Sequence, residues 1–190
     1  IPGGRNLVSG DGSASTDYLE TFSWMRAHTP PGSVIISWWD YGYWIRVAGN
    51  RSSVADNGTI NKTQIAWIGR MMMERNPLDA LRIARRWNAK YVLAHFGLYQ
   101  AFFSGDENKW QWMIRIAGEV FGNQVPTEDA FWDSQTGAIY PALWDTLLYN
   151  LLWVNASAEL TPWNIKMPTG YQEPIVTSNP AKRIFSMFKA

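Results

Sequence analysis

The sequence contains no cysteine, which excludes a disulfide framework, a thiolate metal site and a cysteine nucleophile. It has only two histidines, His28 and His95, and neither has an evident third metal ligand or nucleophile nearby, so neither a zinc site nor a catalytic triad is expected. No apolar run reaches about 18 residues, so no transmembrane helix is predicted, and no signal peptide is recognisable. A net charge of +1 argues against a nucleic-acid partner bound through its phosphates.

The 190 residues are enough for one domain with a substantial core, and a hydrophobic content of 46% argues against disorder. Twelve tryptophans are an unusual number, typical of aromatic-lined grooves or of contact with another surface. The chain starts at Ile1 rather than at methionine, which is consistent with a piece of a longer protein. Residues 1–15 are rich in Gly and Ser and are interpreted as an entry linker to a single domain.

Periodicity and turn residues predict a helix-rich mixed α/β domain with a small central sheet. Asp17 is the expected cap of a helix at 18–28, and Asn61, with Gln64 three residues on, marks the start of another. Pro77 marks the start of a third. Further helices are expected at 106–121 and 142–153, and strands at 34–39, 53–56, 90–95 and 183–188.

The order strand, helices, strand between residues 34 and 95 predicts a right-handed parallel crossover. Both strands then end at the same edge of the sheet, which is where ligands bind in open α/β layers. His95 is therefore expected near the segment that follows the first strand.

That segment, residues 37–44, holds three tryptophans, two tyrosines and one aspartate. Asp40 can accept a hydroxyl proton while an indole N–H donates to the same oxygen, an arrangement that suits an alcohol. Trp38 and Trp39 can face one site only if the chain already turns there, and Gly42 permits a sharp change of direction. The alternative is a set of core aromatics beside an ordinary turn.

A second group, formed by Asp106, Lys109 and Met113, has the spacing of one helix face. It is open to a plain interpretation, namely a capping aspartate, an exposed ion pair and a core methionine. In the functional interpretation, Asp106 orients Lys109 and the thioether of Met113 contacts a methyl group. A hydroxyl read by Asp40 together with a methyl read by Met113 describes a threonine side chain, so such a site should prefer Thr to Ser modestly and exclude Val or Ala firmly.

Three stretches resemble the catalytic subunit of oligosaccharyltransferase. Residues 38–42 match its five-residue WWDYG signature, residues 56–66 are similar to the Asn/Thr-rich stretch that follows it, and residues 106–113 are similar to its DK motif. The motifs occur in the family's order over about residues 30–120, and the signature is highly specific.

The resemblance implies a C-terminal domain held below a multi-span membrane domain, on the extracytoplasmic face of the cell membrane. It implies that the domain binds the Ser or Thr at position +2 of an Asn-x-Ser/Thr acceptor polypeptide, through residues of the two motifs: Trp38, Trp39, Asp40, Tyr41, Gly42, Asp106, Lys109 and Met113. The lipid-linked oligosaccharide and a divalent metal, Mn or Mg, are expected to bind the membrane part, so no metal ligand or catalytic residue is assigned in this chain. The isolated domain should be inactive, and its short length is similar to that of compact archaeal members.

Other interpretations remain open. A tryptophan-rich carbohydrate-binding module would bind glycans on exposed aromatic platforms, a structural receptor domain would use the tryptophans only for packing, and Asp40 with Asp56 could form a glycosidase carboxylate pair. The chain also carries acceptor sequences of its own, which are either self-glycosylated or unmodified loops, at Asn50, Asn57, Asn61 and Asn155.

Overall fold

The computed structural model describes residues 16–95, 98–99, 102–103, 105–152 and 185–189, and these residues define the fold. The predicted linker at 1–15 and the acceptor sequence at Asn155 lie outside the described residues. Within them, no helix is both long enough and apolar enough to span a bilayer.

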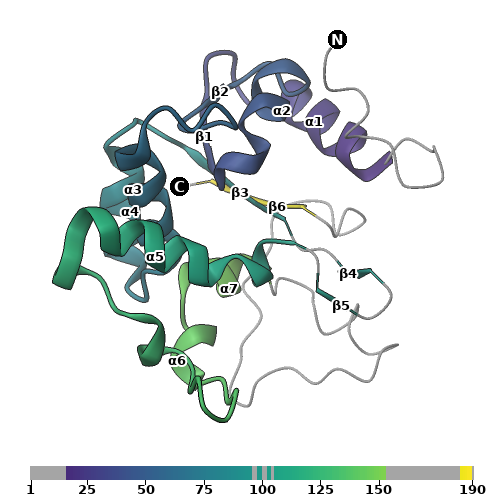
Figure 1. Ribbon diagram of the computed structural model, residues 1–190. Helices are drawn as coiled ribbons and strands as arrows, with labels where there is room; N and C mark the ends of the chain where they lie inside the picture. Colours follow the sequence, from purple (N-terminus) through teal and green to yellow (C-terminus); the bar gives the residue numbers. More distant parts are fainter. Residues whose placement is uncertain (1–15, 96–97, 100–101, 104, 153–184, 190) are drawn as a thin grey trace.

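A small sheet lies at the centre of the fold, as predicted (Figure 1). Its strand order is β2-β1-β3-β6, where β1 is Val34–Ser37, β2 is Ser52–Ser53, β3 is Tyr91–His95 and β6 is Phe185–Lys189. The first three strands are parallel and β6 runs antiparallel to β3. A separate hairpin is formed by β4, Leu98–Tyr99, and β5, Phe102–Phe103.

Strands β1 and β3 are the two central strands, and almost all their side chains are buried. Continuous apolar runs of this kind are typical of parallel strands covered on both faces. Ile35 pairs with Tyr91 and Ser37 with Leu93, so the two strands end at the same edge. The predicted parallel crossover is therefore confirmed.

The chain turns directly after β1. The strand was expected to reach residue 39, but it ends at Ser37 and is followed by the 3-10 helix η2, Trp39–Tyr41, and by α2, Gly42–Val47. Gly42 has the ordinary helical φ of −58°, so the turn does not need its conformational freedom. It needs the missing side chain, because a Cβ there would lie 2.2 Å from the Ala55 carbonyl oxygen.

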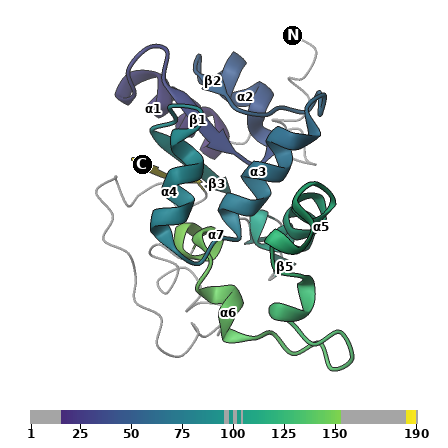
Figure 2. The same cartoon turned by 90° about the vertical axis from the view of Figure 1, so that its left-hand side faces the viewer.

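Helices surround the sheet, with α1, Thr16–His28, and α2 on one side (Figures 1 and 2). Helix α3, Lys62–Met72, begins as predicted, since the Asn61 side chain accepts a hydrogen bond of 3.1 Å from the Gln64 N–H. Helix α4, Pro77–Arg85, begins at its proline as predicted, and Asn76 caps it. Helix α1 starts at Thr16, so Asp17 lies within the helix instead of capping it.

Two predicted helices are interrupted. The helix expected from residue 106 consists of the 3-10 helix η3, Asp106–Asn108, and α5, Trp110–Phe121, which ends at Gly122 with φ +56°. The helix expected at 142–153 is split into α6, Pro141–Trp144, and α7, Leu147–Leu152. Thr146 lies at the break, where its hydroxyl donates to the Leu143 carbonyl at 2.7 Å. Short 3-10 helices η4, Gly122–Gln124, and η5, Glu128–Ala130, follow α5.

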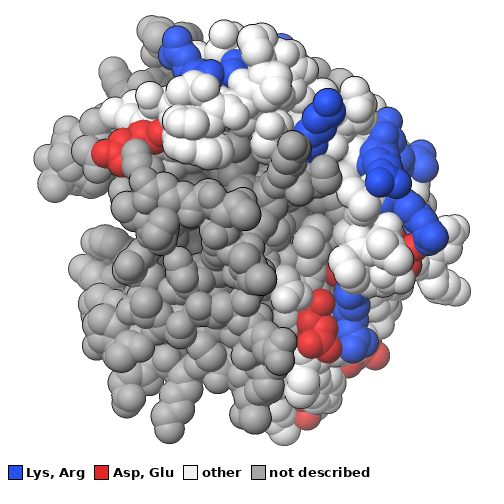
Figure 3. Space-filling model, turned by 180° about the vertical axis from the view of Figure 1, so that it is seen from behind, with Lys and Arg blue, Asp and Glu red and all other residues white. Residues whose placement is uncertain are grey.

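Helices α3 and α4 and the turns beside them form a basic segment. Residues 62–90 contain seven Lys or Arg and only two Asp or Glu. Figure 3 shows Lys and Arg side chains gathered along one edge of the face opposite to that of Figure 1. Although the overall charge is only +1, the chain therefore has a basic segment, which lies between the two motifs in the sequence.

Helices α3 and α5 run side by side and approach closely at Gly69 (Figure 2). A Cβ at Gly69 would lie 2.5 Å from the carbonyl oxygen of Met113 and 3.1 Å from its Cα. These are backbone atoms, which cannot rotate away as a flexible side chain can. This contact fixes α5, and with it the start of the helix that carries the second motif.

We expect Gly69→Ala to lower the free energy of unfolding by about 1–3 kcal/mol, because the helices must separate to admit the methyl group. Gly118→Ala is the matched control, since Gly118 lies within α5 and a Cβ there would have no atom within 4 Å. That control should raise stability by roughly 0.5–1 kcal/mol through helix propensity. Urea unfolding of the three proteins measures both changes, and equal stabilisation by the two substitutions would contradict the tight α3–α5 contact.

Candidate functional site

The carboxylate of Asp40 and the ammonium of Lys109 form an ion pair at the edge where β1 and β3 end. Asp40 lies in η2, directly after β1, and Lys109 lies in the joint between η3 and α5. About a quarter of each side chain is exposed, 27% for Asp40 and 24% for Lys109. The structure thus brings together the two motifs that the sequence separates by 69 residues.

Lys109 contacts two further groups behind this ion pair. Its Nζ lies 3.3 Å from the Asp106 carboxylate and donates to the Tyr41 hydroxyl at 3.2 Å. The ammonium also lies 4.9 Å from the centre of the Tyr41 ring. Burial lowers the pKa of Lys109, but Asp106 and Asp40 outweigh burial and raise it, so the lysine is charged at neutral pH.

Asp106 is fully buried, and each of its carboxylate oxygens has a partner. One oxygen accepts the His95 backbone N–H at 2.8 Å, and the other accepts the Tyr41 hydroxyl at 3.2 Å. Burial raises the pKa of Asp106, while Lys109 and these hydrogen bonds oppose the rise. The end of β3 therefore positions the carboxylate that in turn positions Lys109.

Tyr41 and His95 complete the buried part of the site. Burial, reinforced by the Asp106 charge, raises the pKa of Tyr41, so the phenol keeps its proton and can donate. The Tyr41 hydroxyl lies 2.9 Å from Nδ1 of His95. Burial, with the Lys109 charge as a second cause, lowers the pKa of His95 to about 4, so the imidazole is neutral at pH 7. Sequence reasoning placed His95 near the first motif but gave it no role.

A second loop supports the first motif from outside. The side-chain amide of Asn57 donates to the Asp40 carbonyl at 3.0 Å. Asp56 accepts from Arg46 at 2.8 Å and from the Gly58 N–H at 2.9 Å, which closes the loop. Because Asp56 is engaged in this way, it is poorly suited to be the second carboxylate of a glycosidase pair.

The other predicted site residues are less accessible. Trp38 is 2% exposed and Met113 is 0% exposed, so both pack in the core of the free chain. Trp39 is half-buried, and its ring centre lies 6.4 Å from that of Trp38. Of the two adjacent indoles, Trp39 is therefore the one with surface to offer a ligand. A contact between Met113 and a bound peptide requires Met113 to become exposed.

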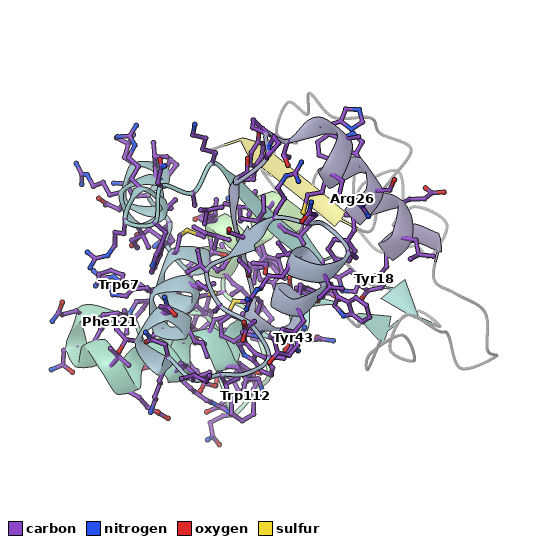
Figure 4. All side chains as sticks on the ribbon, turned by 90° about the horizontal axis from the view of Figure 1, so that it is seen from above. Tyr18, Arg26, Tyr43, Trp67, Trp112 and Phe121 are labelled. Atoms are coloured by element: carbon purple, nitrogen blue, oxygen red, sulfur yellow. The ribbon has the colours of Figure 1, made fainter. Side chains whose placement is uncertain are left out.

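Exposed apolar side chains occur on the same elements as the site. Tyr43 in α2 is 48% exposed, Trp112 in α5 is 58% exposed, and Ile60, which follows the Asn57 loop, is 96% exposed. Figure 4 shows Tyr43 and Trp112 on the same side of the molecule, away from Trp67 and Phe121. Exposed apolar side chains therefore lie on α2, on α5 and next to the Asn57 loop.

Three of the candidate glycosylation asparagines lie in the described residues, and all three are exposed. Asn50 has a positive φ of 51°, the side chain of Asn61 caps α3, and Asn57 contacts the first motif as given above. Within the part of the chain that the structure describes, no three His, Asp or Glu side chains are grouped to hold a metal ion.

Comparison with known proteins identifies the family. The model of the STT3/PglB/AglB core domain matches residues 31–125, half of the chain, including both motifs. The chain belongs to this family. The STT3B subunit of dolichyl-diphosphooligosaccharide–protein glycosyltransferase from Oryza sativa is 45% identical over 105 residues, which cover 55% of this chain and 14% of that protein. The stt3 subunit from Schizosaccharomyces pombe is 32% identical over 152 residues, 77% of this chain and 20% of that protein.

The fold is similar to that of solved archaeal structures. The C-terminal globular domain of oligosaccharyltransferase from Archaeoglobus fulgidus superposes with a TM-score of 0.54 at 16% identity, covering 91% of this chain and 95% of that domain. A longer oligosaccharyltransferase from the same organism, in complex with an inhibitory peptide and a dolichol-phosphate, gives a TM-score of 0.56 at 16% identity over 75% of this chain and 22% of that one. At these identities the match shows the fold alone. The chain spans a fifth or less of the curated relatives described above.

The stability of the domain should depend on pH through His95. Its pKa of about 4 in the folded chain lies below the ordinary value of 6.5, so its contribution is complete above pH 6.5 and is lost as the pH falls toward 4. The raised pKa of Asp106 changes the pH dependence of stability in the opposite direction. A variant that replaces His95 and keeps Asp106 therefore shows the contribution of the histidine alone. Between pH 7 and pH 5 the wild type should lose about 2 kcal/mol of unfolding free energy relative to His95→Asn. Urea unfolding at a series of pH values measures this difference, and parallel curves would show that His95 is not kept neutral by the fold.

Proposed function

We propose that this chain is the acceptor-recognition part of an oligosaccharyltransferase and that it binds the Ser or Thr of Asn-x-Ser/Thr sequences. One observation carries the proposal. Lys109 bonds one carboxylate oxygen of Asp40, Oδ2, while Oδ1 has no hydrogen-bond partner among the described residues and the side chain remains 27% exposed. The site therefore holds an oriented carboxylate, paired with a cation on one oxygen, whose other oxygen is available to accept a hydroxyl proton.

Lys109 makes this carboxylate suitable for a neutral ligand. Because the ammonium stays on Oδ2 and balances the charge, an alcohol can bind Oδ1 without displacing the ion pair. A hydrogen bond to a charged acceptor contributes about 1.5–3 kcal/mol, more than one between neutral groups. An acceptor with Val or Ala at the same position lacks the donor and leaves Oδ1 of Asp40 desolvated without a hydrogen bond, which makes the discrimination large.

Relatives support this assignment. An oligosaccharyltransferase from Archaeoglobus fulgidus with the same fold, at a TM-score of 0.55, has been solved with a tethered acceptor peptide containing an NVT sequon. By this similarity we propose that an acceptor polypeptide is the first binding partner of this chain. The dolichol-phosphate complex gives a lipid-linked oligosaccharide as the second, bound by the rest of the protein.

The remaining expectations belong to the whole protein. We place this chain on the extracytoplasmic face of a membrane enzyme and expect Mn or Mg to be bound outside it, so that the 190 residues alone do not transfer glycan. One related archaeal structure contains Zn and sulfate, which is consistent with a divalent site in the longer enzyme. An archaeal origin remains a prediction, since the curated relatives compared above come from a plant and a yeast.

The carbohydrate-binding alternative has no comparable support. It requires several exposed aromatic platforms, but among the described residues Trp112 is the one tryptophan whose side chain is largely exposed. Trp38 and Trp110 are buried in the core. The tryptophan content is thus explained mainly by packing.

Asp40→Ala in the full-length enzyme should abolish measurable acceptor-peptide binding, because it removes the hydroxyl acceptor and leaves Lys109 without its exposed partner. Asp40→Asn should weaken binding at least about tenfold, since the charge-assisted hydrogen bond is lost. Asp145→Ala is the matched control, because Asp145 forms an exposed ion pair with Arg75. Affinity is measured by titration with a labelled Asn-x-Thr peptide, and unchanged binding by the Asp40 variants would reject the proposed function.

Met113→Ala should reduce affinity for Thr acceptors more than for Ser acceptors if the thioether meets the threonine methyl group. Because Met113 is fully buried, the same change should also lower the free energy of unfolding by about 2–5 kcal/mol. Peptide titrations at a temperature where the variant remains folded separate the two effects. Equal losses for Thr and Ser would show that Met113 acts only through packing.

A further inference from the structure

His95 belongs to the buried hydrogen-bond network of the site but to neither of the two motifs. Its backbone N–H holds Asp106, and its ring holds the Tyr41 hydroxyl. The ring also lies 5.5 Å from that of Tyr18, which belongs to α1. The side chain is 8% exposed, so it does not reach solvent as a ligand contact would.

Three of the groups around the Tyr41 hydroxyl oxygen differ in their hydrogen-bonding capacities. Lys109 Nζ, at 3.2 Å, can only donate, and an ionised Asp106, also at 3.2 Å, can only accept. The single phenolic proton therefore goes to Asp106. If it pointed instead to the imidazole, the Tyr41 and Asp106 oxygens would face each other with no proton between them.

This assignment determines the state of the imidazole. Nδ1 of His95 lies 2.9 Å from the Tyr41 oxygen, and the proton of that hydrogen bond must come from the histidine. His95 is then the neutral Nδ1–H tautomer, in which Nε2 carries no proton. Neutral histidine in water favours the other tautomer, so the fold would select the less common form.

We propose that His95 is a positioning residue for acceptor binding, in which its Nδ1–H fixes the Tyr41 hydroxyl and thereby holds Lys109 against Asp40. This rests on the proposed function of Asp40. Tyr41 is the neutral contact of the ammonium, between the two charged ones. Without the histidine the phenol oxygen loses one of its donors, and the ring is no longer held on that side within reach of the lysine. The ammonium would then be free to move toward Asp106 and away from Asp40.

The tautomer can be tested directly by nitrogen-15 NMR of the 190-residue chain, which has only one other histidine, His28. The imidazole signals of His95 should show a protonated Nδ1 and an unprotonated Nε2 at pH 7. A protonated Nε2 with a bare Nδ1 would overturn the proposal. This measurement does not depend on any acceptor or on the rest of the enzyme.

The positioning role is tested with three variants of the full-length enzyme. In His95→Asn the side-chain amide nitrogen takes the position of Nδ1. In His95→Gln the amide nitrogen lies near the position of Nε2 instead. His95→Leu keeps a similar side-chain volume but has no hydrogen-bond donor. We expect His95→Leu and His95→Gln to raise the KM for an Asn-x-Thr peptide about tenfold with kcat nearly unchanged, and His95→Asn to remain within about threefold of wild type.

Two outcomes of these assays are decisive and distinguishable. If folded His95→Asn loses as much affinity as His95→Leu, the donor at Nδ1 has no positioning role and the proposal fails. If Asp40→Asn leaves the KM unchanged, the acceptor function of the site fails, whereas the NMR result for the tautomer stands separately. A merely structural histidine would give equal losses for the Asn and Gln variants.

Discussion

One ammonium group satisfies two carboxylates that the chain brings to the same place. Lys109 lies against Asp40 at the surface and against Asp106 in the interior. An isolated buried carboxylate would cost several kcal/mol, so Asp106 can be ionised in the core only because the lysine and two hydrogen bonds accompany it. Asp106 thereby fixes Lys109 from the interior, and the ammonium remains able to pair with Asp40 at the surface. The partly exposed carboxylate that we assign to acceptor binding depends on this buried support.

The backbone around the ion pair is arranged to allow it. Parallel pairing of β1 with β3 brings the ends of both strands to one edge, and the first motif follows β1 directly. The chain can turn there because Gly42 has no side chain to meet Ala55. The Asn57 amide then holds the Asp40 carbonyl from the other side. Each of these contacts restricts the backbone of Asp40, which makes its carboxylate an oriented group before any ligand arrives.

Local patterns allowed much of this to be predicted. The apolar runs of β1 and β3, the Asn61 cap and the five-residue signature each depend on neighbouring residues, and all were found in the sequence. The burial of Trp38 and Met113 was not determined by spacing, because spacing shows which residues share a face but not what covers that face. The break at Thr146 arises from a side chain that competes for a backbone carbonyl, which periodicity does not detect.

The contribution of His95 could not be read from the sequence for a different reason. Its partner Tyr41 is 54 residues away, and a histidine at the end of an apolar strand has no distinctive pattern. Only the sheet register shows that the two rings meet. The signal available from sequence was the position of His95 directly after the last buried residues of a strand that ends beside the first motif.

The large separation of Asp40 and Lys109 along the chain has a consequence for biosynthesis. Their ion pair spans 69 residues and closes only when the intervening helices are packed, so a nascent or partly unfolded chain cannot present an oriented Asp40. Local unfolding of either strand would separate Asp40 from Lys109 even where the helices remain formed. The acceptor binding that we propose would consequently begin only once this domain has finished folding.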